Sequence, residues 1–237
     1  MKYIDLTLPT PAENLACDEA LLEACEAGLA DEILRFWEPQ EPFVVVGYAN
    51  QIAREVNLEA CKGRNIPGLR RCSGGGTVLQ GAGCLNYSLL LKIPDAGPLR
   101  SISGTNSFIM ERHRAALQSL LKGRVHVQGH TDLTLDNLKF SGNAQRRRKN
   151  FLIFHGTFLL RFDLPLVEQF LRMPSKQPEY RQSRPHTEFL TNLNISPEVV
   201  KSALREIWNA NTPLPALPAP PRELLDKYLT DEWNFKF

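Results

Sequence analysis

Long apolar runs are missing from this 237-residue sequence. No stretch approaches the roughly 18–20 consecutive apolar residues that a membrane-spanning helix needs. The first ten residues carry Asp5 and lack the apolar core of a secretory signal. These absences exclude membrane and secreted classes, so we expect a cytoplasmic protein without a membrane attachment.

Cysteine is sparse and confined to the first part of the sequence. The five residues are Cys17, Cys25, Cys61, Cys72 and Cys84, and no two of them have C-x-x-C spacing. An odd number without that spacing argues against a disulfide framework and against a zinc knuckle. We therefore expect reduced thiols.

Two phosphate-binding signatures and a strong charge bias are also lacking. The sequence has neither the G-x-x-x-x-G-K-[ST] loop nor the G-x-G-x-x-G pattern. The formal net charge of +2 is too small to argue for a nucleic-acid partner. The composition, 43% hydrophobic and 23% charged, suits a globular protein with a sizeable core.

The sequence does contain a mixture of helix-like and strand-like segments. Thr10, Pro11 and Glu13 form a capping box with proline in the first turn, and Gly28 ends the helix that they begin. We expect further helices at 106–122, after Asp163 as N-cap, and from Ser196 to near residue 209. Strands are expected at 32–37, 42–47, 84–92, 124–128, 133–135, 138–144 and 151–163. This predicts an α+β fold with mixed or antiparallel sheets flanked by helices.

Three consecutive glycines stand in the segment 69–77, LRRCSGGGT. Glycine permits positive φ and close approach of the backbone to a ligand, and successive N–H groups in such a turn bind anions. Arg70 and Arg71 add donors for a phosphate or carboxylate, and Ser73 adds a hydroxyl. The alternative is a flexible hairpin with solvated arginines, and the glycines alone do not decide between the two.

Lys139 stands in an otherwise apolar strand, next to the small residues Gly142 and Ala144. It is either a strand-edge lysine that reaches water or a fixed ammonium directed into a cleft, where it can hold a carboxylate or stabilise a phosphoryl group. His155 lies on the strand face opposite the apolar residues. For His155 we expect a hydrogen-bonded structural role and no catalytic one.

Taken in order, these segments resemble the biotin/lipoate A/B protein ligase family, specifically its lipoate–protein ligase A type. The resemblance covers about residues 3–209. It rests on 14–22 (NLACDEALL), 34–57, 70–78 (RRCSGGGTV), 85–88 (LNYS), 129–133 (GHTDL), 138–145 (LKFSGNAQ), 155–160 (HGTFLL) and 184–193 (RPHTEFLTNL). Each motif alone is weak, whereas the ordered set is specific.

The resemblance implies a fold like that of class II aminoacyl-tRNA synthetases and biotin ligases, with a catalytic domain at 1–210. It implies that ATP and Mg²⁺ activate lipoic acid, or octanoate, to an acyl-adenylate, with Lys139 as the catalytic residue and Asp132 as a magnesium ligand. The implied binding residues are Arg70, Arg71, Ser73, Gly74, Gly75, Gly76, Thr77, Asp132, Lys139, Ser141, Gly142 and Ala144.

The implied partners are lipoyl carrier domains, such as those of 2-oxoacid dehydrogenase acyltransferase subunits or the glycine cleavage H protein. Carrier domains of this kind are commonly acidic, so the basic run 146–149 at a hairpin tip is either solvated surface or a steering patch. Residues 211–237 are expected to form a proline-rich linker and a short helix in place of an accessory domain. A separate accessory protein would then assist adenylation.

Two alternatives stay open. An ATP-independent octanoyl or lipoyl transferase would use a cysteine thioester, for which Cys72 in the glycine segment is the one candidate. A non-catalytic binder of lipoate or of a carrier protein would keep the apolar slot and tolerate loss of Lys139. His130 and Thr131 depart from the Arg-Asn pair that is usual in the family, which bears on pyrophosphate handling.

Overall fold

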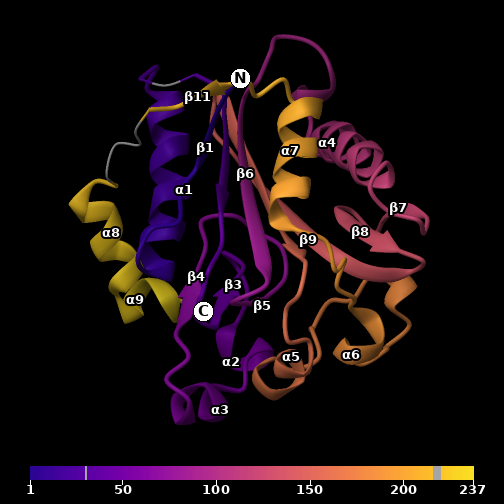
Figure 1. The fold of residues 1–237 in the computed structure, drawn as a ribbon. Helices are drawn as coiled ribbons and strands as arrows, with labels where there is room; N and C mark the ends of the chain where they lie inside the picture. Colours follow the sequence, from indigo (N-terminus) through magenta and orange to yellow (C-terminus); the bar gives the residue numbers. More distant parts are fainter. Residues whose placement is uncertain (30, 216–219) are drawn as a thin grey trace.

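An eight-stranded mixed sheet forms the centre of the fold (Figure 1). Its spatial order is β11 (Thr212–Pro213), β1 (Lys2–Asp5), β2 (Ile33–Trp37), β6 (Cys84–Lys92), β10 (Phe151–Leu159), β9 (Leu138–Arg147), β8 (Asp132–Leu135) and β7 (Val125–Gln128). Strands β11, β1 and β2 pair in parallel, and the other neighbours pair antiparallel. The computed structural model describes residues 1–29, 31–215 and 220–237. The predicted α+β class with a mixed sheet is confirmed.

Helices cover both faces of this sheet because its central strands alternate between two hydrophobic clusters. Leu152 and Phe154 of β10 pack with α4 (Ile102–Gln118) and α7 (Pro197–Ile207), whereas Ile153 between them packs with α1 (Pro11–Glu26). The period of two along the strand explains this division. The face toward α1 also receives polar residues of the same strands, and these build the site described below.

A second sheet of three strands lies beside the first, in the order β4 (Gly68–Arg70), β3 (Phe43–Val46) and β5 (Val78–Gln80). Strand β3 is apolar along its whole length because both of its faces are buried. Phe43 and Val45 pack with α1, and Val44 and Val46 pack with α2 (Ile52–Glu55), α3 (Leu58–Gly63) and α5 (Pro165–Phe170). The glycine turn, which we define as residues 71–77, joins β4 to β5.

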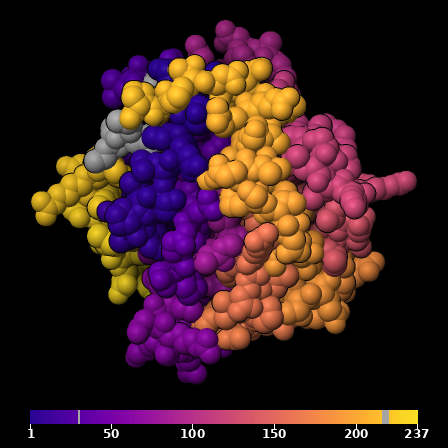
Figure 2. All heavy atoms as spheres, in the orientation of Figure 1, coloured from indigo at the N-terminus to yellow at the C-terminus, as the bar shows by residue number. Residues whose placement is uncertain are grey.

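The remaining elements are short. They are η1 (Pro98–Arg100), η2 (Glu179–Arg181), α6 (His186–Phe189), α8 (Arg222–Leu229) and α9 (Asp231–Asn234). Helices α8 and α9 lie beside α1, and their yellow atoms border the indigo N-terminal residues on the surface (Figures 1 and 2). Of the predicted proline-rich linker, Thr212 and Pro213 pair with β1, and residues 216–219 lie outside the described residues. No helix in the described residues is both long and apolar enough to cross a membrane.

Several boundaries follow the sequence patterns and a few depart from them. The capping box of α1 and the bounds of β6 are as predicted. Helix α4 begins earlier than expected, since Ser101 caps it through the Gly104 N–H at 3.0 Å. The prediction of Asp163 as an N-cap is wrong: α5 has Leu164 at that position without a side-chain bond, and Pro165 starts the helix. Strand β10 ends at Leu159, after which the chain bonds to the Gly83 carbonyl.

His113 of α4 is a neutral histidine enclosed in the core. Its Nε2 accepts a hydrogen bond from Trp208 Nε1 at 2.9 Å, and its ring meets Tyr87 edge-on. Among the described residues its Nδ1 has no hydrogen-bond partner. Burial lowers the pKa of His113 from 6.5 to about 3, because a charged imidazole would lose its hydration there.

Acid is therefore expected to destabilise the fold through His113. The unfolded chain takes up a proton near pH 6.5 and the folded chain only near pH 3, so stability is lost as the pH falls through this window. The slope approaches ~1.4 kcal/mol per pH unit. His113→Gln, which keeps an acceptor for Trp208, is expected to lose less stability than the parent between pH 7 and pH 5 in urea unfolding. The exposed His126→Gln serves as control, and identical pH slopes for parent and His113→Gln would contradict the assignment.

Candidate functional site

A cavity of about 880 Å³ lies between the two sheets. This volume falls within the roughly 300–1,000 Å³ of typical small-molecule sites. The part of its lining that comes from α1, the small sheet and the surroundings of α5 is mainly apolar. These residues include Leu15, Val45, Val78, Leu79, Val167 and Leu171. Such a wall suits an alkyl chain rather than a charged ligand.

The wall formed by β8 and β9 carries an ion pair. Lys139 Nζ lies 2.8 Å from Asp132 Oδ1, and the Lys139 side chain is 24% exposed. Tyr180 donates its hydroxyl to Asp132 Oδ2 at 2.7 Å. Burial and the neighbouring carboxylate of Asp132 raise the pKa of Tyr180, so it remains a donor. A Cβ at Gly142 would lie 3.1 Å from Lys139 Nζ, so the glycine leaves space beside the ammonium.

Asp132 is engaged by two residues of this chain. Its two carboxylate oxygens already hold Lys139 and Tyr180. In the part of the chain that the structure describes, no group of three or more His, Cys, Asp or Glu side chains is placed to hold a metal ion. Asp132 therefore orients Lys139, and its role as a magnesium ligand stays a prediction.

Asn143 was not predicted as a site residue, yet it fixes the loop that carries Asp132. Its Nδ2 donates to the Thr131 carbonyl at 2.6 Å, and the Thr131 hydroxyl donates to the Asn143 carbonyl at 2.8 Å. Tyr87 anchors Asn143 by donating to Oδ1 at 2.6 Å. Asn143, Thr131 and His130 all line the cavity. These reciprocal bonds link β9 to the loop before β8 and hold Asp132 in position without a ligand.

The glycine turn contributes four residues to the cavity lining: Arg71, Gly75, Gly76 and Thr77. Arg71 is buried and donates within its own turn, to the Gly74 carbonyl at 2.5 Å and the Gly76 carbonyl at 2.8 Å. Burial lowers the pKa of Arg71 to about 10. Gly75 has φ of 87°, a conformation that favours glycine. Arg71 therefore shapes the turn from inside. From β9, Ser141, Gly142 and Ala144 join Lys139 in the lining.

Three residues expected at the ligand are not part of the cavity lining: Arg70, Ser73 and Gly74. Gly74 is exposed to solvent, and a Cβ added to it would meet nothing within 4 Å. The side chain of Arg70 is fully buried and donates to main-chain carbonyls, including those of Gly47 and Tyr48. Its position at the base of the turn corrects the expectation of a phosphate contact.

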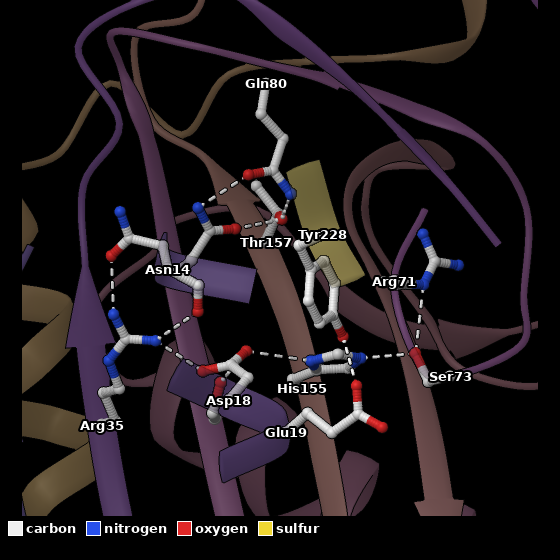
Figure 3. A network of polar contacts seen from close by, with 12 residues as sticks. Asn14, Asp18, Glu19, Arg35, Arg71, Ser73, Gln80, His155, Thr157 and Tyr228 are labelled. Carbon is white, nitrogen blue, oxygen red and sulfur yellow. Dashed lines mark hydrogen bonds and ion pairs between the residues drawn. The ribbon is translucent and has the colours of Figure 1, made fainter. Parts of the chain in front are cut away.

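Ser73 instead belongs to a buried chain of polar contacts (Figure 3), in which its hydroxyl accepts from Arg71 Nε at 3.1 Å. Its Oγ lies 2.5 Å from His155 Nε2, and His155 Nδ1 lies 3.1 Å from Asp18 Oδ2. Asp18 also pairs with Arg35 at 2.6 Å and accepts from the Ser88 hydroxyl at 2.7 Å.

The partners fix the protons of this chain. Burial acts to raise the pKa of Asp18, but the charge of Arg35 and the hydrogen bonds from His155 and Ser88 outweigh it and hold the pKa below its usual value. An ionised Asp18 accepts, so His155 donates to it from Nδ1, and in the neutral ring Nε2 then accepts from the Ser73 hydroxyl. His155 thus bridges the sheet to the glycine turn, and a hydrogen-bonded histidine was the prediction. Neither of its nitrogens is free for substrate.

The five cysteines are buried, and none lines the cavity. Burial raises the pKa of Cys72 to about 12, and it does the same for Cys84. A thiol with such a pKa is almost entirely protonated near neutrality and is a poor nucleophile. The arrangement disfavours the thioester route that Cys72 would have served.

The basic run 146–149 at the end of β9 is largely committed to contacts within the protein. Arg146 donates to the Cys72 carbonyl at 2.8 Å, Arg147 donates to the Leu99 carbonyl at 2.6 Å, and Arg148 pairs with Glu23. Lys149 at the hairpin tip is exposed. The run therefore ties β9 to its surroundings more than it forms a patch of free cations.

The mixed sheet encloses a cavity with an apolar wall and an ammonium held by a carboxylate, an arrangement that suits an apolar acid. The family model of the lipoyl protein ligase A/B catalytic domain matches residues 10–206, and the chain belongs to this family.

Curated relatives within this family carry two kinds of name. Octanoyltransferase LipM of Geobacillus kaustophilus is 24% identical over 99% of this chain and 98% of its own length. Lipoate-protein ligase A subunit 1 of Thermoplasma acidophilum is 27% identical over 97% and 95%. The chain is thus an enzyme of the lipoate–protein ligase and octanoyltransferase family, and the names alone do not choose between the two activities.

Solved structures share the fold over nearly the whole chain. A T. acidophilum lipoate protein ligase with bound lipoic acid has a TM-score of 0.82 at 25% identity and covers 99% of this chain and 98% of that one. A lipoate-protein ligase A bound with ATP has a TM-score of 0.82 at 26% identity, covering 99% of each chain. A bipartite lipoate protein ligase with its E2 lipoyl domain, also from T. acidophilum, has a TM-score of 0.80 at 25% identity, covering 99% and 96%.

Two neighbouring glycines of the turn are expected to respond differently to alanine. In Gly75→Ala the new Cβ would lie 2.7 Å from Arg71 Nη2, which its own hydrogen bonds hold in place, and the residue would keep a positive φ. We expect the free energy of unfolding to fall by about 1–2 kcal/mol. Gly74→Ala, with open space at that position, is the matched control and should stay within about 0.5 kcal/mol of the parent in urea unfolding. Equal losses in the two variants would show that the turn is not shaped as described.

Proposed function

We propose that this protein is a lipoate–protein ligase, which activates lipoate or octanoate with ATP and transfers the acyl group to a lysine of a lipoyl carrier domain. The observation that carries the proposal is the Lys139–Asp132 pair, which stands in the same cavity as an apolar wall and two exposed-backbone glycines. The relatives named for lipoic acid and ATP support the choice of substrates.

In the first step, a carboxylate oxygen of the acid attacks the α-phosphorus of ATP, and the bond to the β-phosphate breaks to release pyrophosphate. Two anions must approach each other, so a cation and oriented N–H groups are needed to offset the repulsion. Lys139 supplies the cation. The main chain at Gly75 and Gly76 supplies surface that a phosphate can approach without a side chain in the way.

In the second step, the amine of the carrier lysine attacks the carbonyl carbon of the acyl-adenylate. The carbon–oxygen bond to AMP breaks, AMP leaves, and the amine loses a proton to solvent. Negative charge develops on the carbonyl oxygen, and Lys139 stabilises it. Asp132 and Tyr180 keep the ammonium in place through both steps. Magnesium would be held by the nucleotide phosphates together with the carboxylate of Asp132, and it would offset part of the phosphate charge.

The alternative activity is acyl transfer from an acylated donor protein without ATP. The names of the octanoyltransferase relatives favour it. A thioester intermediate, however, needs a reactive thiol at the cavity, and the cysteines of this chain are buried with a raised pKa for Cys17, Cys72 and Cys84. We therefore place ligation first.

The carrier domain and an accessory protein are the proposed partners. The ligase from T. acidophilum is described as bipartite and was solved with its E2 lipoyl domain. For this chain we propose the same kind of carrier, which inserts its lysine toward Lys139. The ATP experiment described next also tests whether a separate subunit is needed for adenylation.

The requirement for ATP is the first test. The purified protein is mixed with a lipoyl domain, Mg²⁺ and lipoic acid, with or without ATP, and the carrier is weighed by intact mass. We expect a lipoyl mass gain only with ATP. Gain only from an acylated donor protein would replace ligation by transfer. Gain from synthetic lipoyl-adenylate but not from ATP would show that adenylation needs another protein.

Loss of the ammonium is the second test. Lys139→Ala is expected to lower the rate of acyl transfer by roughly 30- to 1,000-fold, which corresponds to about 2–4 kcal/mol of transition-state stabilisation. The fold should persist, because the Lys139 side chain is not part of a hydrophobic cluster. Lys149→Ala at the exposed hairpin tip is the matched control and should keep the parent rate. Unchanged transfer by Lys139→Ala would remove the residue from the mechanism and favour a binding protein.

A further inference from the structure

The C-terminal segment, residues 222–237, packs directly beside the glycine turn. Helix α8 lies along α1, and α9 contacts β4, the strand that leads into the turn (Figure 1). Tyr228 of α8 is fully buried in the cluster that contains Leu15 and Leu69. The segment is thus part of the wall behind the site rather than a loose tail.

Arg70 is the first point of attachment. Its Nε donates to the Trp233 carbonyl at 3.1 Å and its Nη2 to the Asn234 carbonyl at 3.1 Å, while Nη1 donates to the Gly47, Tyr48 and Asn50 carbonyls at 2.9, 3.0 and 2.9 Å. No carboxylate pairs with Arg70 within the described parts of the chain. The guanidinium therefore joins the C-terminal segment to the loop after β3.

The main chain of Arg70 is held by the same two tail residues. Its N–H donates to Asn234 Oδ1 at 2.9 Å, and its carbonyl accepts from Trp233 Nε1 at 2.8 Å. Both main-chain groups of the residue that precedes the turn are thus satisfied by α9. This pairing replaces the strand neighbour that β4 lacks on its outer edge.

Glu19 of α1 is the second point of attachment (Figure 3). Its Oε2 accepts from Lys227 Nζ and from the Tyr228 hydroxyl, each at 2.7 Å. Its Oε1 lies 4.0 Å from Arg146, which donates to the Cys72 carbonyl at 2.8 Å. Through Glu19 and Arg146 the tail reaches the interior of the turn as well as its base.

We propose that residues 222–237 are a positioning element of the acyl-transfer site, which fixes the glycine turn by holding Arg70 in front of it and Cys72 within it. Three adjacent exposed glycines have more backbone freedom than any other tripeptide, and a ligand that orders them loses affinity in doing so. A turn already held at both points spares the ligand that loss. The kinetic part of this proposal rests on the proposed function.

The test uses the full chain with two substitutions in α9, Trp233→Phe and Asn234→Ala, combined. The first keeps the aromatic packing and removes the N–H that reaches Arg70, and the second removes the acceptor of the Arg70 N–H. We expect KM for lipoic acid to rise about tenfold while kcat stays within about threefold, because positioning affects ligand binding more than the chemical step. Glu232→Ala, exposed on the same helix, is the matched control and should keep both constants.

Amide hydrogen exchange gives a readout that needs no activity. In the double variant, the amides of residues 71–77 should exchange faster than in the parent. The amides of the large sheet should exchange at the parent rate. Parent exchange in the turn together with parent KM would overturn the proposal. Faster exchange throughout the protein would overturn it as well, since the tail would then stabilise the whole fold rather than the turn. If the parent ligates nothing, the exchange data still decide this question separately from the proposed function.

Discussion

A positive charge buried between α1 and the large sheet sets the conditions for the rest of the site. Arg35 is completely enclosed and is tolerated there because Asp18 faces it at 2.6 Å and Asn14 accepts two of its bonds, through its carbonyl and its side chain. An enclosed guanidinium without its carboxylate would be strongly destabilising, so Asp18 has little freedom to move. With Asp18 fixed, the tautomer of His155 is fixed, and with it the hydroxyl of Ser73. The geometry of the glycine turn thus depends in part on a charge pair behind the cavity wall.

Much of this fold can be predicted from local sequence patterns. Thr10 and Glu13 predict the start of the first helix. The alternation of residues in β10 agrees with a sheet covered on both faces. The uninterrupted apolar run of β3 agrees with a strand buried on both sides. Lys139 stood out because a lone cation in an apolar strand needs a reason. The structure places it in the cavity with a carboxylate, which the spacing to Asp132 alone did not reveal.

The sequence alone did not distinguish the structural roles of Arg70 and Arg71. The two residues are adjacent and chemically identical, yet one bonds within the turn and the other reaches carbonyls contributed by α9, more than 160 positions later. Asn143 and Tyr87 were missed for the same reason, since their partners become neighbours only when β9, β10 and β6 have assembled. Asp163 failed as a cap because Pro165 and Leu164 already determine where α5 starts. Local preference yields where tertiary contacts supply the stronger constraint.

The contacts that hold residues 222–237 to Arg70 and Glu19 join positions far apart in the sequence. These separations bear on the order in which the molecule folds. Trp233 meets Arg70 across 163 positions, and Tyr228 meets Glu19 across 209. Closing loops of that size is slow compared with forming helices or hairpins, and a chain growing from the ribosome presents its last residues last. The scaffold can therefore form before residues 222–237 are made, while the ligand-facing turn acquires its final shape only once this segment has packed against it. With residues 222–237 not yet packed onto α1, a nascent chain would bind its substrate poorly, so binding competence would follow the docking of this segment.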